Sequence, residues 1–270
     1  MAFGFTVAND VYWLLFVVVF FSANLGDSLL LINVKNQGGD VLQETISANV
    51  SDDTVLLEFQ RSDGTLVTQL VDFRHEVQIL KALVLGEEER GQSQYQVMCF
   101  VNHIDKMEFI SPDAMAKLRQ KNPGTVRTPE EDRGRENMTM ELFVDVARAG
   151  VISRHVPVLC AEASDATYTR RADIDMWSQL PGSSKASLLA AVREYNGLVP
   201  PPQRCLETHA PWQACTCHLE LCIGWYPCGL KYCRGANPRT ANYRCGIRTC
   251  RKCSLYLYYV RQKQLCLWDE

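Results

Sequence analysis

Apolar and polar residues alternate along several short runs in the first part of the chain, and this period of two is typical of half-buried strands. The runs cover residues 29–34, 55–59, 65–71, 77–85 and 95–101. Between the second and third runs, residues 62–64 read Ser-Asp-Gly, a sequence typical of a hairpin turn. The pattern therefore predicts an antiparallel meander.

A different pattern begins after residue 110. Ser111 and Pro112 are the residue types favoured at a helix N-cap and at the first helical position, and Pro123 ends the pattern. These signals predict a helix over residues 111–121. The polarity of the sequence then predicts a surface loop, a strand and a second helix, in that order, at residues 122–138, 140–146 and 187–195.

The N-terminus carries an unbroken apolar run at residues 11–21. A membrane-spanning helix needs about 20 apolar residues, so the run is too short to cross a bilayer and suits the core of a secretory signal peptide. Ser22, Ala23 and Gly26 follow it and offer small residues for cleavage. We therefore expect a signal peptide over residues 1–26 and a secreted, extracellular protein that does not span the membrane. A buried first strand or helix is the alternative.

Cysteines are concentrated at the other end of the chain. Ten of the twelve lie in the last quarter, namely Cys205, Cys215, Cys217, Cys222, Cys228, Cys233, Cys245, Cys250, Cys253 and Cys266. This density indicates either disulfides or bound metal, and export favours disulfides. Cys215 and Cys217 are too close for a comfortable bridge, so each is expected to have a different partner.

Two further cysteines, Cys99 and Cys160, stand alone in the first 200 residues. A bridge between them would close a loop of about 60 residues, which is worth roughly 4 kcal/mol on the loop-entropy model. Two buried free thiols are the alternative.

These features predict an α+β fold in which an antiparallel sheet with flanking helices precedes a small, disulfide-rich and mainly β domain. The expected organisation has four parts: a signal peptide, an α+β domain, a helical and Pro-rich linker, and a cysteine-rich domain, at residues 1–26, 27–175, 176–203 and 204–270.

Charge is distributed unevenly between these parts. Residues 201–270 contain ten Lys or Arg and four Asp or Glu, a balance of about +6, so the remainder must carry about −9 to give the net charge of −3. A basic exported region suggests weak binding to anionic glycans, and an ordinary solvated surface is the simpler interpretation. We expect no nucleic-acid partner. Asn49 and Asn137 each begin an Asn-x-Ser/Thr triplet and are predicted glycosylation sites.

The order of Asp72-Phe, Cys99-Phe-Val, Ser111-Pro and Leu159-Cys160 resembles a BRICHOS domain. The resemblance implies a small sheet flanked by two helices, a buried pH-responsive carboxylate at Asp72, and a disulfide between Cys99 and Cys160. A solvated carboxylate at the end of a hairpin is the alternative for Asp72.

Longer strings carry a second resemblance, which covers nearly the whole chain after the leader. Residues 82–100, 114–123, 225–233, 243–250 and 264–270 resemble the Out at first family. That family implies a secreted protein of animal development, including that of the nervous system, with a BRICHOS-like domain and a cysteine-rich C-terminal domain. Relative to the family's cysteine pattern, Cys222 and Cys253 are additional, and we therefore expect them to bond to each other.

Three functional hypotheses follow. The first is a secreted developmental protein that binds an unknown extracellular protein, with the BRICHOS-like domain acting as an intramolecular chaperone. Its client would be residues 254–260, an apolar and aromatic run without Pro or Gly, for which an ordinary core strand is the alternative. The second is a zinc-binding regulatory module that uses ligand-type residues such as Cys215, Cys217 and His218.

The third hypothesis is an enzyme, and the sequence disfavours it. It contains no nucleophile elbow, no phosphate-binding loop, no dinucleotide fingerprint and no zinc-protease motif. The histidines are scattered, at positions 75, 103, 155, 209 and 218. We therefore expect no catalytic residue, no metal and no cofactor. Arg170 and Arg171 form a dibasic pair that is either a processing site or simply solvated.

Overall fold

A computed structural model of the 270-residue chain describes residues 28–35, 39–86, 95–120, 122–195, 203–234 and 243–267. The predicted signal peptide, residues 1–26, lies outside the described residues. Within those ranges, no helix is long and apolar enough to cross a membrane.

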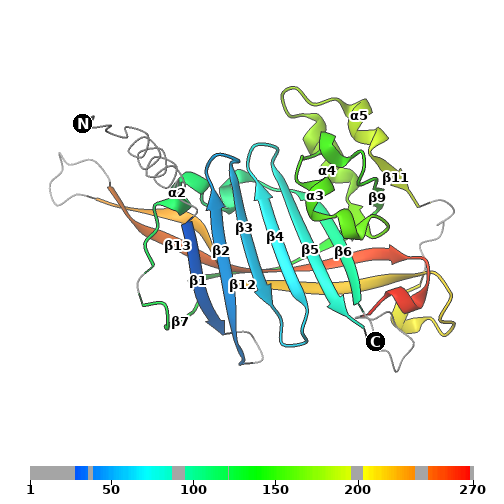
Figure 1. Cartoon of the computed structure of the whole chain (residues 1–270), viewed down its shortest axis with the longest axis horizontal. Helices are drawn as coiled ribbons and strands as arrows, with labels where there is room; N and C mark the ends of the chain where they lie inside the picture. The colour runs from blue at the N-terminus through cyan, green and yellow to red at the C-terminus, as the bar shows by residue number, and fades with distance from the viewer. Residues whose placement is uncertain are drawn as a thin grey trace, which may run out of the picture.

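Most of the described chain is β-structure, and the larger of its two sheets has the strand order β11-β9-β10-β6-β5-β4-β3-β2-β1-β7 (Figure 1). Its centre is an antiparallel meander, as the alternation predicts. The meander consists of β1 (Ser28–Lys35), β2 (Val41–Asn49), β3 (Thr54–Gln60), β4 (Leu66–Asp72), β5 (Val77–Leu85) and β6 (Tyr95–His103). The strand β2 is the one member that the sequence pattern does not predict.

Short strands extend the meander at both edges. On one side β7 (Val126–Arg127) runs parallel to β1. On the other side β10 (Thr167–Thr169) runs parallel to β6, and β9 (Leu142–Val144) and β11 (Val192–Glu194) continue in antiparallel fashion. The strand predicted at residues 140–146 is therefore present as β9.

The smaller sheet lies across one face of the larger one (Figure 1). Its core is a long antiparallel hairpin of β12 (Cys215–Cys233) and β13 (Tyr243–Val260), and β8 (Glu131–Met140) pairs in parallel with β13 as an edge strand. The surface loop predicted over residues 122–138 is therefore wrong for its second half. Those polar residues form an edge strand that buries only Met138 and Met140.

The α-helices of the described residues are short: α2 (Pro112–Ala116), α3 (Val156–Leu159), α4 (Arg171–Ser178) and α5 (Lys185–Ala190). Ser111 caps α2 as predicted, with its side chain accepting a hydrogen bond from the backbone N–H of Ala114, but the helix stops well before residue 121. The helix predicted at 187–195 likewise ends early, because β11 begins at Val192. Single 3-10 turns occupy Lys106–Glu108, Ala149–Val151, Ala161–Ala163, Cys205–Glu207 and Lys263–Leu265.

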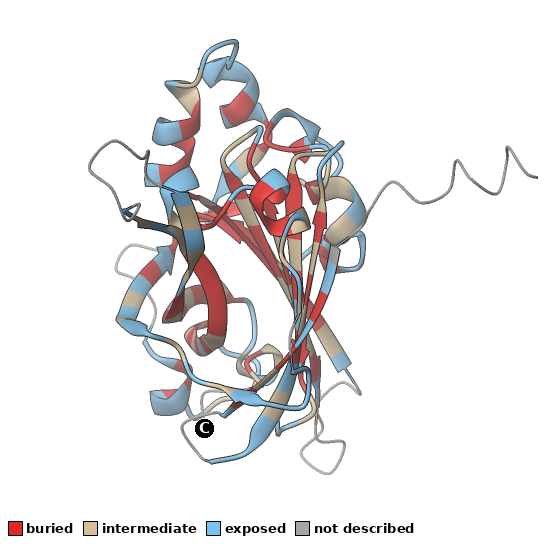
Figure 2. Cartoon of the chain, turned by 90° about the vertical axis from the view of Figure 1, so that its left-hand side faces the viewer, coloured by how far each residue is buried: buried red, intermediate tan, exposed pale blue. Residues whose placement is uncertain are grey.

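Two hydrophobic clusters lie on the two faces of the large sheet. On β6, Met98 and Phe100 point into the cluster between the sheets, whereas Val97, Cys99 and Val101 point into the cluster under α3, α4 and α5. The buried positions accordingly line the space between the layers (Figure 2). The first cluster contains residues from both the meander and the cysteine-rich region, so the two regions share one core.

Candidate functional site

Asp72 ends strand β4, and its carboxylate is buried beneath the segment that carries Ser153. It accepts hydrogen bonds from the backbone N–H groups of Arg74 and His75 at 3.0 and 3.1 Å, from His75 Nδ1 at 2.7 Å and from Ser153 Oγ at 2.6 Å. Burial raises the pKa of Asp72, but the hydrogen bonds from Ser153 and His75 outweigh it and hold the pKa below its ordinary value. Asp72 is therefore ionised at neutral pH and anchors the Ser153 segment.

The cluster of Asp72, His75 and Ser153 is not arranged for nucleophilic catalysis. In a nucleophile–base pair the histidine accepts the proton of the serine hydroxyl. Here the hydroxyl of Ser153 and the ring of His75 both donate to the same carboxylate. The three side chains instead anchor the segment that carries Ser153, which precedes α3, to the turn between β4 and β5.

A disulfide between Cys99 and Cys160 provides a second anchor for this segment. It joins the middle of β6 to the end of α3, and both cysteines are fully buried in the cluster beneath the helices. The bridge predicted from the isolation of these two cysteines is therefore present.

The aromatic run at residues 254–260 forms the C-terminal end of β13 and lies against the large sheet. Phe100 of β6 stacks on Tyr256 with ring centroids 4.1 Å apart and meets the edge of Tyr258 at 5.3 Å. Tyr168 of β10 packs on Tyr258 at 5.1 Å. The run is thus a core strand, the simpler of its two interpretations, and residues of β6 and β10 cover its aromatic side chains.

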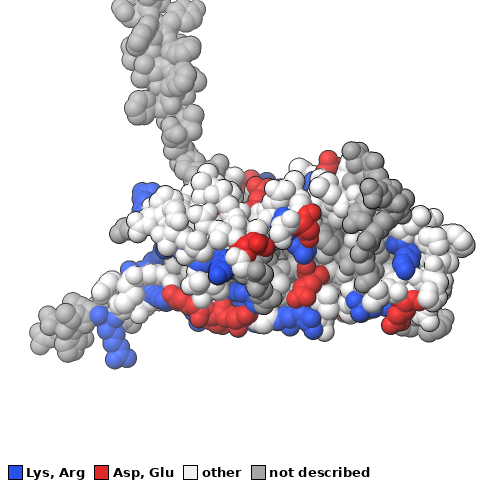
Figure 3. Space-filling view, turned by 90° about the horizontal axis from the view of Figure 1, so that it is seen from below, with Lys and Arg blue, Asp and Glu red and all other residues white. Residues whose placement is uncertain are grey.

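Ion pairs connect β8 to the basic hairpin. Asp132 Oδ2 lies 2.7 Å from Arg251 Nη1, and Lys252 Nζ lies 2.9 Å from Glu136 Oε2 and 3.3 Å from Glu108 Oε2. Acidic and basic side chains accordingly lie next to one another on the face shown in Figure 3. Part of the excess positive charge of residues 201–270 is therefore paired within the molecule, and binding of anionic glycans stays a prediction.

All twelve cysteines are paired. The bridges are Cys99–Cys160, Cys205–Cys215, Cys217–Cys266, Cys222–Cys253, Cys228–Cys250 and Cys233–Cys245. Cys215 and Cys217 have different partners, and the two additional cysteines bond to each other, as predicted. A zinc site built on cysteine needs thiolates, and the sulfur atoms of this chain are instead bonded in pairs.

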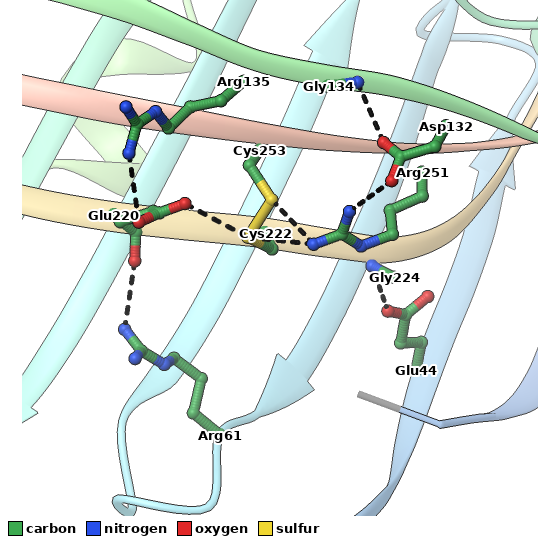
Figure 4. Close-up of a disulfide and its surroundings, with 10 residues drawn as sticks. All are labelled: Glu44, Arg61, Asp132, Gly134, Arg135, Glu220, Cys222, Gly224, Arg251 and Cys253. Carbon is green, nitrogen blue, oxygen red and sulfur yellow. Dashed lines mark hydrogen bonds and ion pairs between the residues drawn. A yellow bond between two sulfur atoms is a disulfide. The ribbon is translucent and has the colours of Figure 1, made fainter. Parts of the chain in front are cut away.

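A groove with a volume of about 270 Å³ runs beside the Cys222–Cys253 disulfide and contains a buried carboxyl group (Figure 4). Glu44 of β2 is 2% exposed; its Oε1 accepts a hydrogen bond from the backbone N–H of Gly224 at 3.0 Å. Burial raises the pKa of Glu44 to about 8, although hydrogen bonds from the backbone of Gly224 and Trp225 lower it in part. The group is therefore mostly protonated at neutral pH.

Gly224 permits this contact between β12 and the large sheet. A Cβ atom at this position would lie 2.6 Å from Val34 Cγ1 and 3.2 Å from Glu44 Oε1. No motif in the sequence marks Glu44 as a site residue. Its position in the alternation could have identified it. Glu44 occupies an inward position of β2, together with Ile46 and Ala48, where an apolar residue is expected.

The two predicted glycosylation sites differ in their surroundings. Asn137 is exposed on the edge strand β8. Asn49 is half-buried, and its Oδ1 accepts hydrogen bonds from Ser51 Oγ at 2.7 Å and from the backbone N–H of Asp52 at 3.0 Å. Both sites stay predictions, and Asn137 offers the freer side chain.

The dibasic pair at the start of α4 is engaged in ion pairs. The guanidinium of Arg170 forms two hydrogen bonds to Asp173, at 2.8 and 2.7 Å, and Arg171 Nη2 lies 2.7 Å from Glu194 Oε1. Arg170 is half-buried, whereas Arg171 is exposed to solvent beside its partner, and processing at this pair stays a prediction.

Comparisons with known proteins identify relatives of the whole chain. The family model described as Out at first matches residues 28–177, and the model described as Out at first, C-terminal, matches residues 204–270. The Out at first protein of Drosophila virilis is 57% identical over 277 residues, which cover 98% of this chain and 90% of that protein. The Out at first protein of Drosophila melanogaster is 59% identical over 255 residues, 90% of this chain but only 52% of that protein. No solved structure matches.

Proposed function

Because the chain belongs to the Out at first family, we propose that it is a secreted developmental protein that acts through contacts with an extracellular protein and not through catalysis. Six disulfides support export, because such bonds persist in oxidising compartments. The anchoring geometry supports a non-enzymatic role for the cluster of Asp72, His75 and Ser153. A role in the nervous system belongs to the same proposal.

The second part of the proposal is that the BRICHOS-like sheet acts as an intramolecular chaperone for the end of β13. The observation that carries it is the stacking of Phe100 on Tyr256, with both side chains fully buried. An apolar, aromatic run without Pro or Gly is prone to pair with other strands when it is exposed. Here β6 and β10 cover its aromatic face, and β8 pairs with its edge.

The order of synthesis supports this role. The meander and β8 are made before β13, and within the meander each strand pairs with the strand next to it in sequence. Local contacts form early, so the covering surface would exist before the aromatic run emerges. The cysteines of the hairpin would then oxidise with β13 already held against Phe100.

Co-expression of the two regions as separate chains tests the chaperone role. We expect residues 204–270, secreted alone, to give little product with its five disulfides correctly paired, and residues 27–175 supplied as a separate chain to raise that yield several-fold. The readout is peptide mapping of the unreduced product.

The matched control is the same helper chain with Phe100→Ala, which removes the surface that covers Tyr256. The helper variant should lose most of the effect. Equal yields of correctly oxidised product with and without the helper chain would refute the chaperone role and leave the proposed secreted role untouched.

A further inference from the structure

The Cys222–Cys253 disulfide differs from the other five in its position. It joins residues that face each other directly in the antiparallel ladder of β12 and β13. Its Cα atoms are 4.0 Å apart, whereas those of the other bridges are 4.9 to 5.9 Å apart. Disulfides usually span about 4.4–6.8 Å between Cα atoms, and this bridge has the shortest span of the six.

The two sulfur atoms of this bridge have different surroundings. Cys222 is half-buried and lines the groove that also contains Glu44 and Arg61, so a thiol can approach its sulfur from solvent. Cys253 is 3% exposed and lies on the central strand of the small sheet. An incoming thiol therefore has access to Cys222 Sγ, and Cys253 Sγ is placed to leave.

A guanidinium group lies against both sulfur atoms. Arg251 Nη2 is 3.1 Å from Cys253 Sγ and 3.7 Å from Cys222 Sγ (Figure 4). Arg251 Nη1 donates to Asp132 Oδ2 at 2.7 Å, and the other oxygen of Asp132 accepts from the backbone N–H of Gly134 at 2.8 Å. The cation is thus held in place from β8, beside the sulfur that would carry negative charge. A neighbouring cation lowers the pKa of a thiol and favours the thiolate.

We propose that Cys222–Cys253 is a site of thiol–disulfide exchange with an extracellular thiol. The thiolate of the incoming molecule attacks Cys222 Sγ, a new disulfide forms between them, and the Cys222–Cys253 bond breaks. Its electron pair goes to Cys253 Sγ, which leaves as a thiolate beside Arg251. A second thiol then attacks the mixed disulfide and releases Cys222. Two thiols are oxidised to one disulfide, and the cross-strand disulfide is reduced to two thiols.

The attacking thiol can belong to a small molecule or to a protein oxidoreductase, because the chemistry at Cys222 is the same. The groove of about 270 Å³ is small, and we therefore use reduced glutathione and a thioredoxin-type protein dithiol as two separate probes. Attack by both identifies a generally accessible site, whereas attack by the protein dithiol alone identifies a site that requires protein contacts. Either result supports exchange, and attack by neither overturns it.

The test uses the intact, fully oxidised protein. It is incubated with increasing amounts of each probe, quenched with a maleimide and mapped by mass spectrometry. We expect Cys222 and Cys253 to be labelled first, and the mixed disulfide with glutathione to form on Cys222. The internal control is Cys233–Cys245, because Cys245 is exposed. If exposure alone governed reduction, that bridge would open first, and this order would overturn the proposal.

Substitution of Arg251 separates its charge from the other features of the site. We expect Arg251→Gln to slow exchange at Cys222 by roughly three- to tenfold and Arg251→Lys to restore part of the rate. Arg248→Gln is the matched control, since Arg248 lies on the same strand and its guanidinium pairs with Glu131 at 3.8 Å. Equal rates in the Gln variants, or a mixed disulfide formed on Cys253, would contradict the proposed roles. If a variant does not fold, the order in which the cysteines of the unsubstituted protein are labelled tests the proposal by itself.

Discussion

The buried position of Glu44 favours the neutral form of its carboxyl group. Its carboxyl is buried between β2 and β12, one oxygen accepts the N–H of Gly224, and the pKa of the group rises to about 8. Asp72 is also buried, but hydrogen bonds from Ser153 and His75 hold its pKa below the ordinary value. Of these two carboxyl groups, the one that titrates near neutrality is therefore Glu44, which the sequence does not single out.

The raised pKa of Glu44 predicts a loss of stability with rising pH. An acid whose pKa is higher in the folded state binds its proton more tightly there, so its favourable contribution is complete below the ordinary pKa of 4.5 and is lost as the pH rises to about 8. We expect Glu44→Gln to change the free energy of unfolding little at pH 5 and to raise it by roughly 3 kcal/mol at pH 7.5. Urea unfolding with intact disulfides measures both values.

The control for this prediction is Glu58→Gln, which removes an exposed carboxylate from the neighbouring strand β3. It should leave the pH dependence of unfolding unchanged. Parallel curves of stability against pH for the Glu44 variant and the unsubstituted protein would show that Glu44 does not titrate between these pH values.

At the scale of elements, strand prediction succeeds where strongly apolar residues recur along one buried face. The alternation predicts the central strands β3 to β6, although Gln69 is buried on the inward face of β4. It does not predict β2, because Glu44 interrupts the apolar face. It does not predict β8, because an edge strand exposes most of its residues and this one is held by ion pairs to β13. Such pairs join residues more than 100 positions apart, so no local pattern reveals them.

The ion pairs of β8 differ in strength according to their burial. Glu136 lies 2.9 Å from Lys252 and 3.5 Å from Arg170, and both cations are only about one-fifth exposed. Burial lowers the pKa of Lys252, but its hydrogen bonds and charge interactions with Glu136 and Glu108 raise the pKa above its ordinary value. Glu130, which immediately precedes β8, pairs with Lys231 at 2.5 Å, where both side chains are nearly half exposed.

Charge reversal at these two positions is expected to have different effects. Glu136→Lys brings a third cation beside Lys252 and Arg170, and we expect it to lower the free energy of unfolding by about 2 kcal/mol and to speed amide exchange along β8. Glu130→Lys is the control and should cost less than about 1 kcal/mol, because exposed pairs contribute little. Hydrogen exchange of residues 131–140 measures the release of the strand. Equal losses in the two variants would mean that burial does not govern these pairs.

At the scale of the whole molecule, the sequence predicts which cysteines stand apart but not how the others pair. The isolation of Cys99 and Cys160 leads to their bridge, and the resemblance to the Out at first cysteine pattern leads to Cys222–Cys253. Cys228–Cys250 and Cys233–Cys245 depend on the register of β12 and β13, which shifts at three irregularities between residues 223 and 232, and the other two bridges join β12 to segments outside the hairpin. Each shift changes which cysteines face each other, and nothing local in the sequence specifies all three.

The arrangement of the two sheets predicts one cooperative unit. The regions at residues 28–177 and 204–270 share a single core between the sheets, and β8 of the first region completes the sheet of the second. With disulfides intact, we expect β5, β6 and β13 to exchange their most protected amide hydrogens with the same free energy of opening. Native-state exchange in increasing denaturant measures this value strand by strand.

Phe100→Ala separates a shared core from two independent domains. The side chain belongs to β6, but its ring stacks on Tyr256 of the hairpin. If the two sheets unfold as one cooperative unit, the substitution should lower the free energy of opening of β6 and of β13 by the same amount, about 3–5 kcal/mol. A hairpin that is stable by itself through its five disulfides would keep its protection while β6 lost its own. That outcome would mean that the predicted boundary at residue 204 separates two independently folding domains.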